Sequence, residues 1–336
     1  MKHIIYLSIL FFALTFASSA QKVQFKNDTA NRKVDVYFGD SYFTSYIYPE
    51  DMEKQVLYPI VTASGKEITR GYPINPRPFE RTDHPHHVGL WLNFGDVNGL
   101  DFWNNSFAVK AEDKYRYGAI KFKEVVDANS KTGTLVTASD WVNIDNETLL
   151  NERTTFVFGE KKGVRTIDRT SELTARQEVT FTENKEGLLG LRMDRAFEEP
   201  ADKAGRFLDA EGNITEVPVL NNDGVNGVYR NAEGFTAGDV WGKRSPWVAL
   251  RAEKEGEVIT VVILDHPDNP NYPAWSHARG YGLFASNNFG GRAIDKNANP
   301  VKLTLKPGEK LVLKHLVVIG GDLTDEQISR IKKSFK

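Results

Sequence analysis

Histidines gather in two short stretches of this chain. His84, His86 and His87 fall within four residues in the run His-Pro-His-His, and His277 follows in the stretch Trp-Ser-His-Ala-Arg at residues 275–279. Histidine can both accept and donate a proton near neutral pH, and it is also the commonest metal ligand. We therefore expect His84 or His87 to act as a general base or acid, with His277 as its partner.

The backbone around the first stretch sets which histidines face together. Pro85 biases the residue before it toward an extended conformation. In an extended backbone, side chains alternate between faces, so His84 and His86 are expected on one face and His87 on the other.

Metal binding is an alternative for the same residues. A zinc site normally needs three protein ligands, and His84 and His86 could supply two, with His277 or Asp265 as a third. Arginines flank both stretches, and guanidinium charge disfavours a divalent cation unless an anion lies between them. We therefore predict a site without metal, with a bound divalent metal as the alternative.

Arginine, aromatic and polar side chains surround the histidines and are the expected substrate ligands. Arginines would hold an anionic or hydroxyl-rich group, and a tryptophan would stack on a sugar ring. Because tryptophan is usually mostly buried, each one alone also fits the core. Asp265 could orient a histidine or serve as a hydrolase carboxylate. The candidate substrate-binding residues are Arg77, Arg81, Trp91, Asp96, Trp103, Tyr272, Trp275, Arg279 and Asn288.

Composition and missing motifs exclude several classes of protein. The chain has 336 residues with 43 Lys and Arg against 45 Asp and Glu, a near balance that argues against nucleic-acid binding. It contains no cysteine, which excludes disulfides and thiolate chemistry. Phosphate-binding glycine loops and the G-x-S-x-G motif are absent from the sequence, so we expect no ATP, NAD, flavin or haem and no serine-hydrolase chemistry.

The N-terminus has the pattern of a secretory signal peptide. A short positive start precedes an apolar run at residues 4–16, and small residues at 17–20 offer a cleavage site after Ala20. The apolar run is shorter than the roughly 20 residues that span a bilayer. We predict a signal peptide at 1–20 and a single domain at 21–336. The mature protein would be secreted or periplasmic, without membrane insertion.

Period-two alternation of apolar residues predicts strands over most of the chain. Residues 301–306 and 311–318 alternate around a Pro-Gly turn and are predicted to pair as a hairpin. His315 lies in the second of these strands, and we interpret it as a structural histidine. No strand–helix–strand rhythm is present, which argues against a parallel sheet and favours an all-β antiparallel fold.

One helix is predicted, at the C-terminus. There Thr324 and Gln327 form a capping box. Three long segments, 70–106, 198–243 and 266–300, interrupt the strands, and long ordered loops of this kind are usually functional. The first and third of these segments contain the two histidine stretches.

The motifs around the histidines resemble those of a family of secreted bacterial proteins that carries the label methane oxygenase PmoA. That resemblance implies a large antiparallel two-layer β-sandwich of the galactose-mutarotase-like type, in proteins found beside glycan-degrading enzymes. The motifs are Arg81-x-x-His84-Pro-His-His87-x-Gly-Leu-Trp91, Gly95-Asp96-Val-Asn-Gly99-x-Asp101-Phe-Trp103, and His277-x-Arg279-x-Tyr281-Gly-Leu-Phe284-Ala-x-Asn287-x-Phe289-Gly290.

Together these features predict a secreted carbohydrate-active enzyme. Its ligand would be a small sugar or oligosaccharide, and its reaction hydrolysis, β-elimination or epimerisation by histidine acid–base chemistry. The alternative is a non-catalytic carbohydrate-binding protein of a glycan-utilisation system, which would use the same aromatic and arginine side chains. A structural cell-surface protein is a third hypothesis, but it leaves the clustered histidines unexplained.

Overall fold

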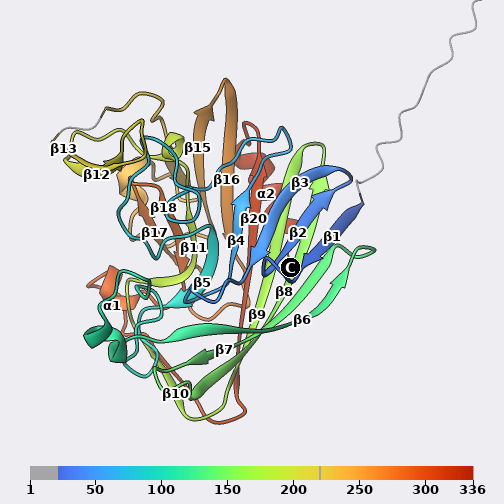
Figure 1. Cartoon of the computed structure of the whole chain (residues 1–336), viewed down its shortest axis with the longest axis vertical. Coiled ribbons are helices and arrows are strands. Elements are labelled where there is room, and N and C mark those ends of the chain that lie inside the picture. The colour runs from blue at the N-terminus through green and yellow to red at the C-terminus, as the bar shows by residue number, and fades with distance from the viewer. Residues whose placement is uncertain (1–21, 219–220, 336) are drawn as a thin grey trace, which may run out of the picture.

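Two eight-stranded antiparallel sheets form the body of the protein (Figure 1). The computed structural model describes residues 22–218 and 221–335. The predicted signal peptide at 1–20 lies outside the described residues. The antiparallel two-layer sandwich predicted from the sequence is confirmed.

The first sheet brings together strands from both ends of the chain. Its order is β1 (Val23–Asp28), β2 (Lys33–Phe38), β3 (Ser41–Ile47), β4 (Val56–Ile60), β5 (Leu90–Phe94), β11 (Gly187–Arg192), β18 (Leu283–Asn287) and β17 (Trp275–Arg279). The last four strands of this order connect the two histidine stretches, because the first stretch leads into β5 and His277 lies in β17.

The second sheet contains the longer strands. Its order is β14 (Val228–Asn231), β15 (Trp247–Lys254), β16 (Glu257–Asp265), β20 (Lys310–Gly320), β9 (Val164–Ala175), β8 (Thr148–Lys161), β7 (Thr134–Val142) and β6 (Ala119–Asn129). Two small ribbons pair β10 (Val179–Thr182) with β19 (Lys302–Leu305) and β12 (Gly205–Leu208) with β13 (Ile214–Val217).

One large hydrophobic cluster joins side chains of both sheets. In β5 the alternate residues Leu90, Leu92 and Phe94 belong to it, whereas Trp91 belongs to a separate cluster on the opposite face of the same strand. Because side chains alternate along a strand, the first sheet is apolar on its inner face and carries the second cluster on its outer face.

The predicted C-terminal helix is confirmed. Helix α2 (Asp325–Ser334) begins at a capping box in which the Gln327 amide donates to Thr324 Oγ1 over 3.3 Å and the Thr324 amide donates to Gln327 Oε1 over 2.8 Å. Ile328 packs with β15 and β16 residues. The structure adds the four-residue helix α1 (Gly291–Ile294) and three short 3-10 helices, η1 (Ala111–Arg116), η2 (Arg195–Phe197) and η3 (Ala237–Val240).

The predicted hairpin at residues 301–318 is wrong. Both strands exist, but β19 pairs with β10, and β20 lies between β16 and β9 in the second sheet. The sequence of β20 places apolar residues on both faces of the strand, which is typical of a central strand. A turn between two strands does not by itself make them neighbours, and here the chain leaves one sheet for another.

A row of paired residues crosses the first sheet beneath the histidines. Trp91 of β5 pairs with Gly190 of β11, Gly190 with Ala285 of β18, and Ala285 with His277 of β17. Directly paired residues point to the same face of a sheet. Trp91 and His277 therefore share the outer face, and Gly190 leaves room between them for the indole of Trp103.

Gly190 is expected to be sensitive to any side chain. A Cβ there would lie 2.5 Å from Trp91 Cζ2 and 2.9 Å from Trp103 Cη2. We predict that Gly190→Ala lowers the free energy of unfolding by about 1–3 kcal/mol, because two buried indoles must move. Gly238→Ala is the matched control, since no heavy atom lies within 4 Å of its added Cβ. Urea titrations measure both, and equal stabilities for the two variants would contradict the packing argument.

Candidate functional site

The first histidine stretch forms a tight turn, not an extended strand. The His87 amide donates to the His84 carbonyl over 2.9 Å, and His84 has a φ of 44°. A left-handed conformation is unfavourable for a residue with a side chain. The expectation that His84 and His86 share a face opposite His87 is therefore wrong. The rings gather instead, with centroids 4.8 Å apart for His84 and His87 and 4.3 Å apart for His86 and His87.

Arg70 holds this turn from inside the protein. Its side chain is 1% exposed, and its two terminal nitrogens donate to the carbonyls of Arg81, Asp83, His84 and His87 over 2.8–3.2 Å. One guanidinium thus organises seven consecutive residues. Sequence reasoning missed Arg70, because nothing in its spacing distinguishes it from a surface arginine.

Arg192 at the end of β11 joins the turn to the sheet. It donates to Asp83 Oδ1 over 2.7 Å, and Arg70 donates to the same oxygen over 3.0 Å. Burial alone would raise the pKa of Asp83, but Arg192, His84 and Arg70 hold it well below its usual range. Asp83 is therefore a carboxylate at physiological pH.

The same arginine fixes the tautomer of His87. Arg192 Nη1 lies 3.2 Å from His87 Nδ1, and because a guanidinium can only donate, Nδ1 must accept. Burial first, and then the charges of its neighbours, lower the pKa of His87 well below its ordinary value. His87 is neutral, and its proton lies on Nε2.

Trp103 connects the turn to His277. Its ring centroid lies 5.8 Å from that of His87 and 6.1 Å from that of His277. His277 is buried, and burial and then Arg279 lower its pKa to about 3. Burial and then Lys54 lower the pKa of His86 to about 2. The structure therefore gathers both histidine stretches on the outer face of the first sheet, with the buried histidines neutral.

Several polar atoms of this cluster have no hydrogen-bond partner within the described residues. Among the ring nitrogens they are His84 Nδ1, His86 Nε2, His87 Nε2, Trp103 Nε1 and His277 Nδ1. Buried polar atoms are normally partnered, so each exception calls for an explanation. Five such ring nitrogens in one cluster are typical of a site that takes up polar atoms from outside the chain.

His84 lies at the outer edge of the cluster. Its side chain is 40% exposed, and its Nδ1 lies 3.2 Å from Asp83 Oδ1. Tyr281 stacks on it with a centroid distance of 4.9 Å. Next to His277, the Arg279 guanidinium lies 3.6 Å from the centroid of Trp241. His84, Tyr281, Arg279 and Trp241 are all partly exposed and form the rim of the site.

Other predicted ligands are buried or are paired inside the protein. Trp91 and Trp103 are fully buried and support the histidines from below. Trp275 is buried too, with Arg244 over its ring. Arg81 donates to Glu198 over 2.6 Å, and Asp96 accepts the Gly99 amide over 3.0 Å.

Asp265 and Asn288 belong to a separate network. Asp265 accepts from the Asn269 side chain over 2.6 Å, from the Asn288 side chain over 3.0 Å and from the Ala274 amide over 2.8 Å. Burial raises the pKa of Asp265. The Tyr272 amide donates to the Asn269 carbonyl in the same loop. These contacts fix the loop that leads into β17, so Asp265 positions the strand of His277 without contacting that histidine.

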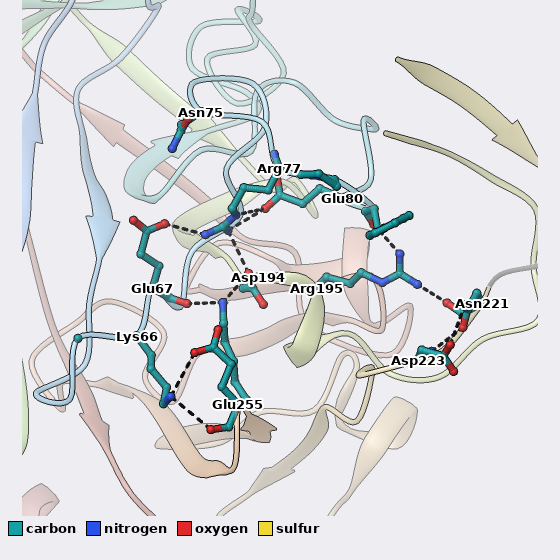
Figure 2. Close-up of a pocket in the computed structure, with 14 residues that line it drawn as sticks. Lys66, Glu67, Asn75, Arg77, Glu80, Asp194, Arg195, Asn221, Asp223 and Glu255 are labelled. Carbon is teal, nitrogen blue, oxygen red and sulfur yellow. Dashed lines mark hydrogen bonds and ion pairs between the residues drawn. The ribbon is translucent and has the colours of Figure 1, made fainter. Parts of the chain in front are cut away.

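A separate cavity of about 780 Å³ is lined in part by Arg77 (Figure 2). The Arg77 guanidinium donates to Glu67 over 2.6 Å, to Glu80 over 2.7 Å and to Asp194 over 3.0 Å. Arg77 is thus engaged by three carboxylates. It shapes the cavity wall instead of offering a free charge to a ligand.

Within residues 22–218 and 221–335, no three His, Asp or Glu side chains are grouped so that they could hold a metal ion. No helix of the described residues is long and apolar enough to cross a membrane.

The sequence matches the family of unknown function DUF6807 over residues 33–333. The chain belongs to this family. Membership in DUF6807 names no activity, and the label methane oxygenase PmoA does not follow from it. No curated protein matches the chain.

Solved structures similar to this DUF6807 protein include three sugar-related proteins. They are an α-galactosidase from Geobacillus stearothermophilus in complex with stachyose (13% identity, 88% of this chain, 40% of that chain, TM-score 0.34), a galactose mutarotase related enzyme from Lactobacillus acidophilus (10%, 90%, 98%, 0.32) and a galactose mutarotase-like protein from Lactobacillus casei (12%, 88%, 99%, 0.35). The chain thus spans two fifths of the α-galactosidase. TM-scores this low are no basis for a function.

Buried neutral histidines should make the protein sensitive to acid. His277 and His315 both have pKa values lowered to about 3, mainly by burial, against about 6.5 in the unfolded chain. Between these values the unfolded state binds protons that the folded state does not, so stability falls as the pH falls. Each histidine would remove about 2 kcal/mol between pH 7 and pH 5.

We therefore predict that His277→Gln and His315→Gln each reduce this acid-induced loss of stability by about 1–2 kcal/mol. Urea denaturation at pH 7 and pH 5 measures the effect. A wild-type stability that does not change over this range would show that these histidines are protonated in the folded protein.

Proposed function

We propose that this protein is a secreted carbohydrate-active enzyme that binds a sugar over the histidine cluster and transfers a proton through His84. The pair of Asp83 and His84 carries the proposal. It joins a carboxylate to a partly exposed imidazole, 3.2 Å apart, an arrangement typical of proton transfer in enzymes.

Asp83 would orient the His84 ring and stabilise its protonated form. Two buried arginines keep it ionised, so it can stabilise an imidazolium as His84 takes up a proton. Buried His87 and His277 are poor candidates for this role, since a base works best when its pKa is close to the operating pH. The sequence left the acid–base role open between His84 and His87. We now assign this role to His84.

The buried part of the cluster suits a neutral, hydroxyl-rich ligand. The Nε2 proton of His87 and the indole N–H of Trp103 are donors, and a sugar hydroxyl can both donate and accept. Arg279 on the rim has no carboxylate within 4 Å among the described residues, and Tyr281 supplies an aromatic face next to His84. Hydrolysis, β-elimination and epimerisation are all compatible with such a base.

The proposed location rests on the sequence. The apolar run at 4–16 and the small residues before Gln21 support export by cleavage after Ala20. Mass spectrometry of the protein from its native host would show a chain that begins at Gln21.

We predict that His84→Gln lowers turnover on the best substrate of a glycan library by roughly 10²–10⁴-fold, the usual contribution of a general acid or base. His315→Gln is the control, because it removes a buried histidine that lies in β20 of the second sheet. Sugar binding by both variants and the wild type is measured by calorimetry. If both variants bind sugar and the wild type turns over no member of the library, the protein is a carbohydrate-binding protein instead.

We further expect turnover to survive EDTA. Arg70 and Arg192 lie against the histidine turn, and their charges disfavour a divalent cation there. Elemental analysis of the purified protein and assays before and after chelation measure this. A stoichiometric metal together with loss of activity on chelation would contradict the prediction.

A further inference from the structure

The cavity beside Arg77 is a second candidate site. It lies among loops from several parts of the chain, and its lining includes Lys66, Glu67, Asn75, Phe79, Asp194 and Glu255 (Figure 2). Its volume of about 780 Å³ falls in the range of small-molecule sites. None of its lining residues belongs to the histidine cluster.

The charges of this cavity largely neutralise one another. Arg77 is shared by Glu67, Glu80 and Asp194. Lys254 lies 2.9 Å from Asp194, and Lys66 lies 3.2 Å from Glu255. A charged ligand would have to compete with these pairs, whereas a neutral polyol can bridge carboxylate and ammonium groups without separating them.

The wall of the cavity is rigid. Glu80 is nearly fully buried and accepts from the backbone amides of Gly71, Tyr72 and Arg77 and from the Arg77 side chain over 2.7–3.0 Å. Figure 2 shows Arg77 between Glu67 and Glu80, with their dashed contacts converging on the guanidinium. Polar groups that are already oriented lose little entropy when a ligand binds.

Phe79 gives the cavity an aromatic platform. The Phe79 amide donates to the Leu208 carbonyl over 2.8 Å, and the Arg195 guanidinium donates to the Phe79 carbonyl over 2.5 Å. Its φ is 66°, so the backbone is held on both sides in a left-handed conformation. The ring nevertheless remains 55% exposed. An exposed aromatic on a fixed backbone suits stacking against the apolar face of a sugar ring.

We propose that this cavity binds a neutral sugar unit of an oligosaccharide, with stacking on Phe79 and hydrogen bonds to Asn75, Glu67 and Lys66. The assignment rests on the proposed function and narrows the substrate from a free monosaccharide to a chain of sugar units. Arg77 and Glu80 in the cavity wall and Asp83 and His84 in the site belong to one segment of eight residues. The two sites therefore adjoin along the chain.

The test uses the full-length protein and a panel of neutral oligosaccharides of two to six units, including cello-, xylo-, malto- and galacto-oligosaccharides. Calorimetry is performed on the wild type and on Phe79→Ala, His84→Gln and Phe107→Ala. Phe107 is the matched control, because it is also an exposed phenylalanine, 64% exposed, and does not line this cavity. Thermal unfolding confirms that each variant is folded.

We expect Phe79→Ala to weaken binding of the best oligosaccharide by roughly tenfold, the scale of one lost aromatic stacking contact. Phe107→Ala should bind within about twofold of the wild type. His84 lies in the proposed catalytic site, so His84→Gln serves to separate a loss of turnover from a loss of binding at the cavity. KM for longer chains should rise in Phe79→Ala, and turnover on short substrates should persist.

The outcomes separate the two proposals. Turnover that depends on His84 but is indifferent to Phe79 at every chain length overturns the cavity assignment and leaves the proposed function intact. Binding that depends on Phe79, without turnover of any substrate, supports the cavity assignment and overturns the proposed enzymatic function. Wild-type protein that binds no member of this neutral oligosaccharide panel overturns the cavity assignment.

Discussion

The contact on which the site depends is the pair of buried arginines against Asp83. Arg70 and Arg192 both donate to Asp83 Oδ1, and neither guanidinium is more than 1% exposed. Two like charges in one buried place repel unless anions and carbonyls compensate. Asp83 and the four carbonyls bound by Arg70 provide that compensation. The histidine turn therefore stabilises the two buried arginine charges.

That constraint explains why the histidines take the arrangement they do. The carbonyls of Arg81, Asp83, His84 and His87 must point inward toward Arg70. This is possible because the chain curls, with His84 in a left-handed conformation. The curl then stacks His84 on His87 and leaves His84 at the surface. Arg192 at the end of β11 completes the arrangement. Its guanidinium can donate hydrogen bonds but cannot accept one, so His87 Nδ1 must be the acceptor.

Local patterns in the sequence were enough to predict the fold class. Alternation identified β20, and the Thr324–Gln327 box identified α2, because both depend on neighbouring residues. The pairing of β19 with β10 could not be predicted in this way, since it depends on residues more than a hundred positions apart. The histidines were found because they are rare and clustered. Arg70 and Arg192 were missed because their role depends on where the carbonyls of another segment point.

The same distinction separates the two kinds of arginine in this protein. Arg77 and Arg81 looked like substrate ligands because they precede the histidines, but buried carboxylates occupy both. Their pairing is informative in another way. A cavity wall whose charges are already satisfied cannot attract an ion strongly, yet it still presents fixed lone pairs and protons. Because most charges of this wall are already paired with one another, the cavity favours neutral polyols over ions.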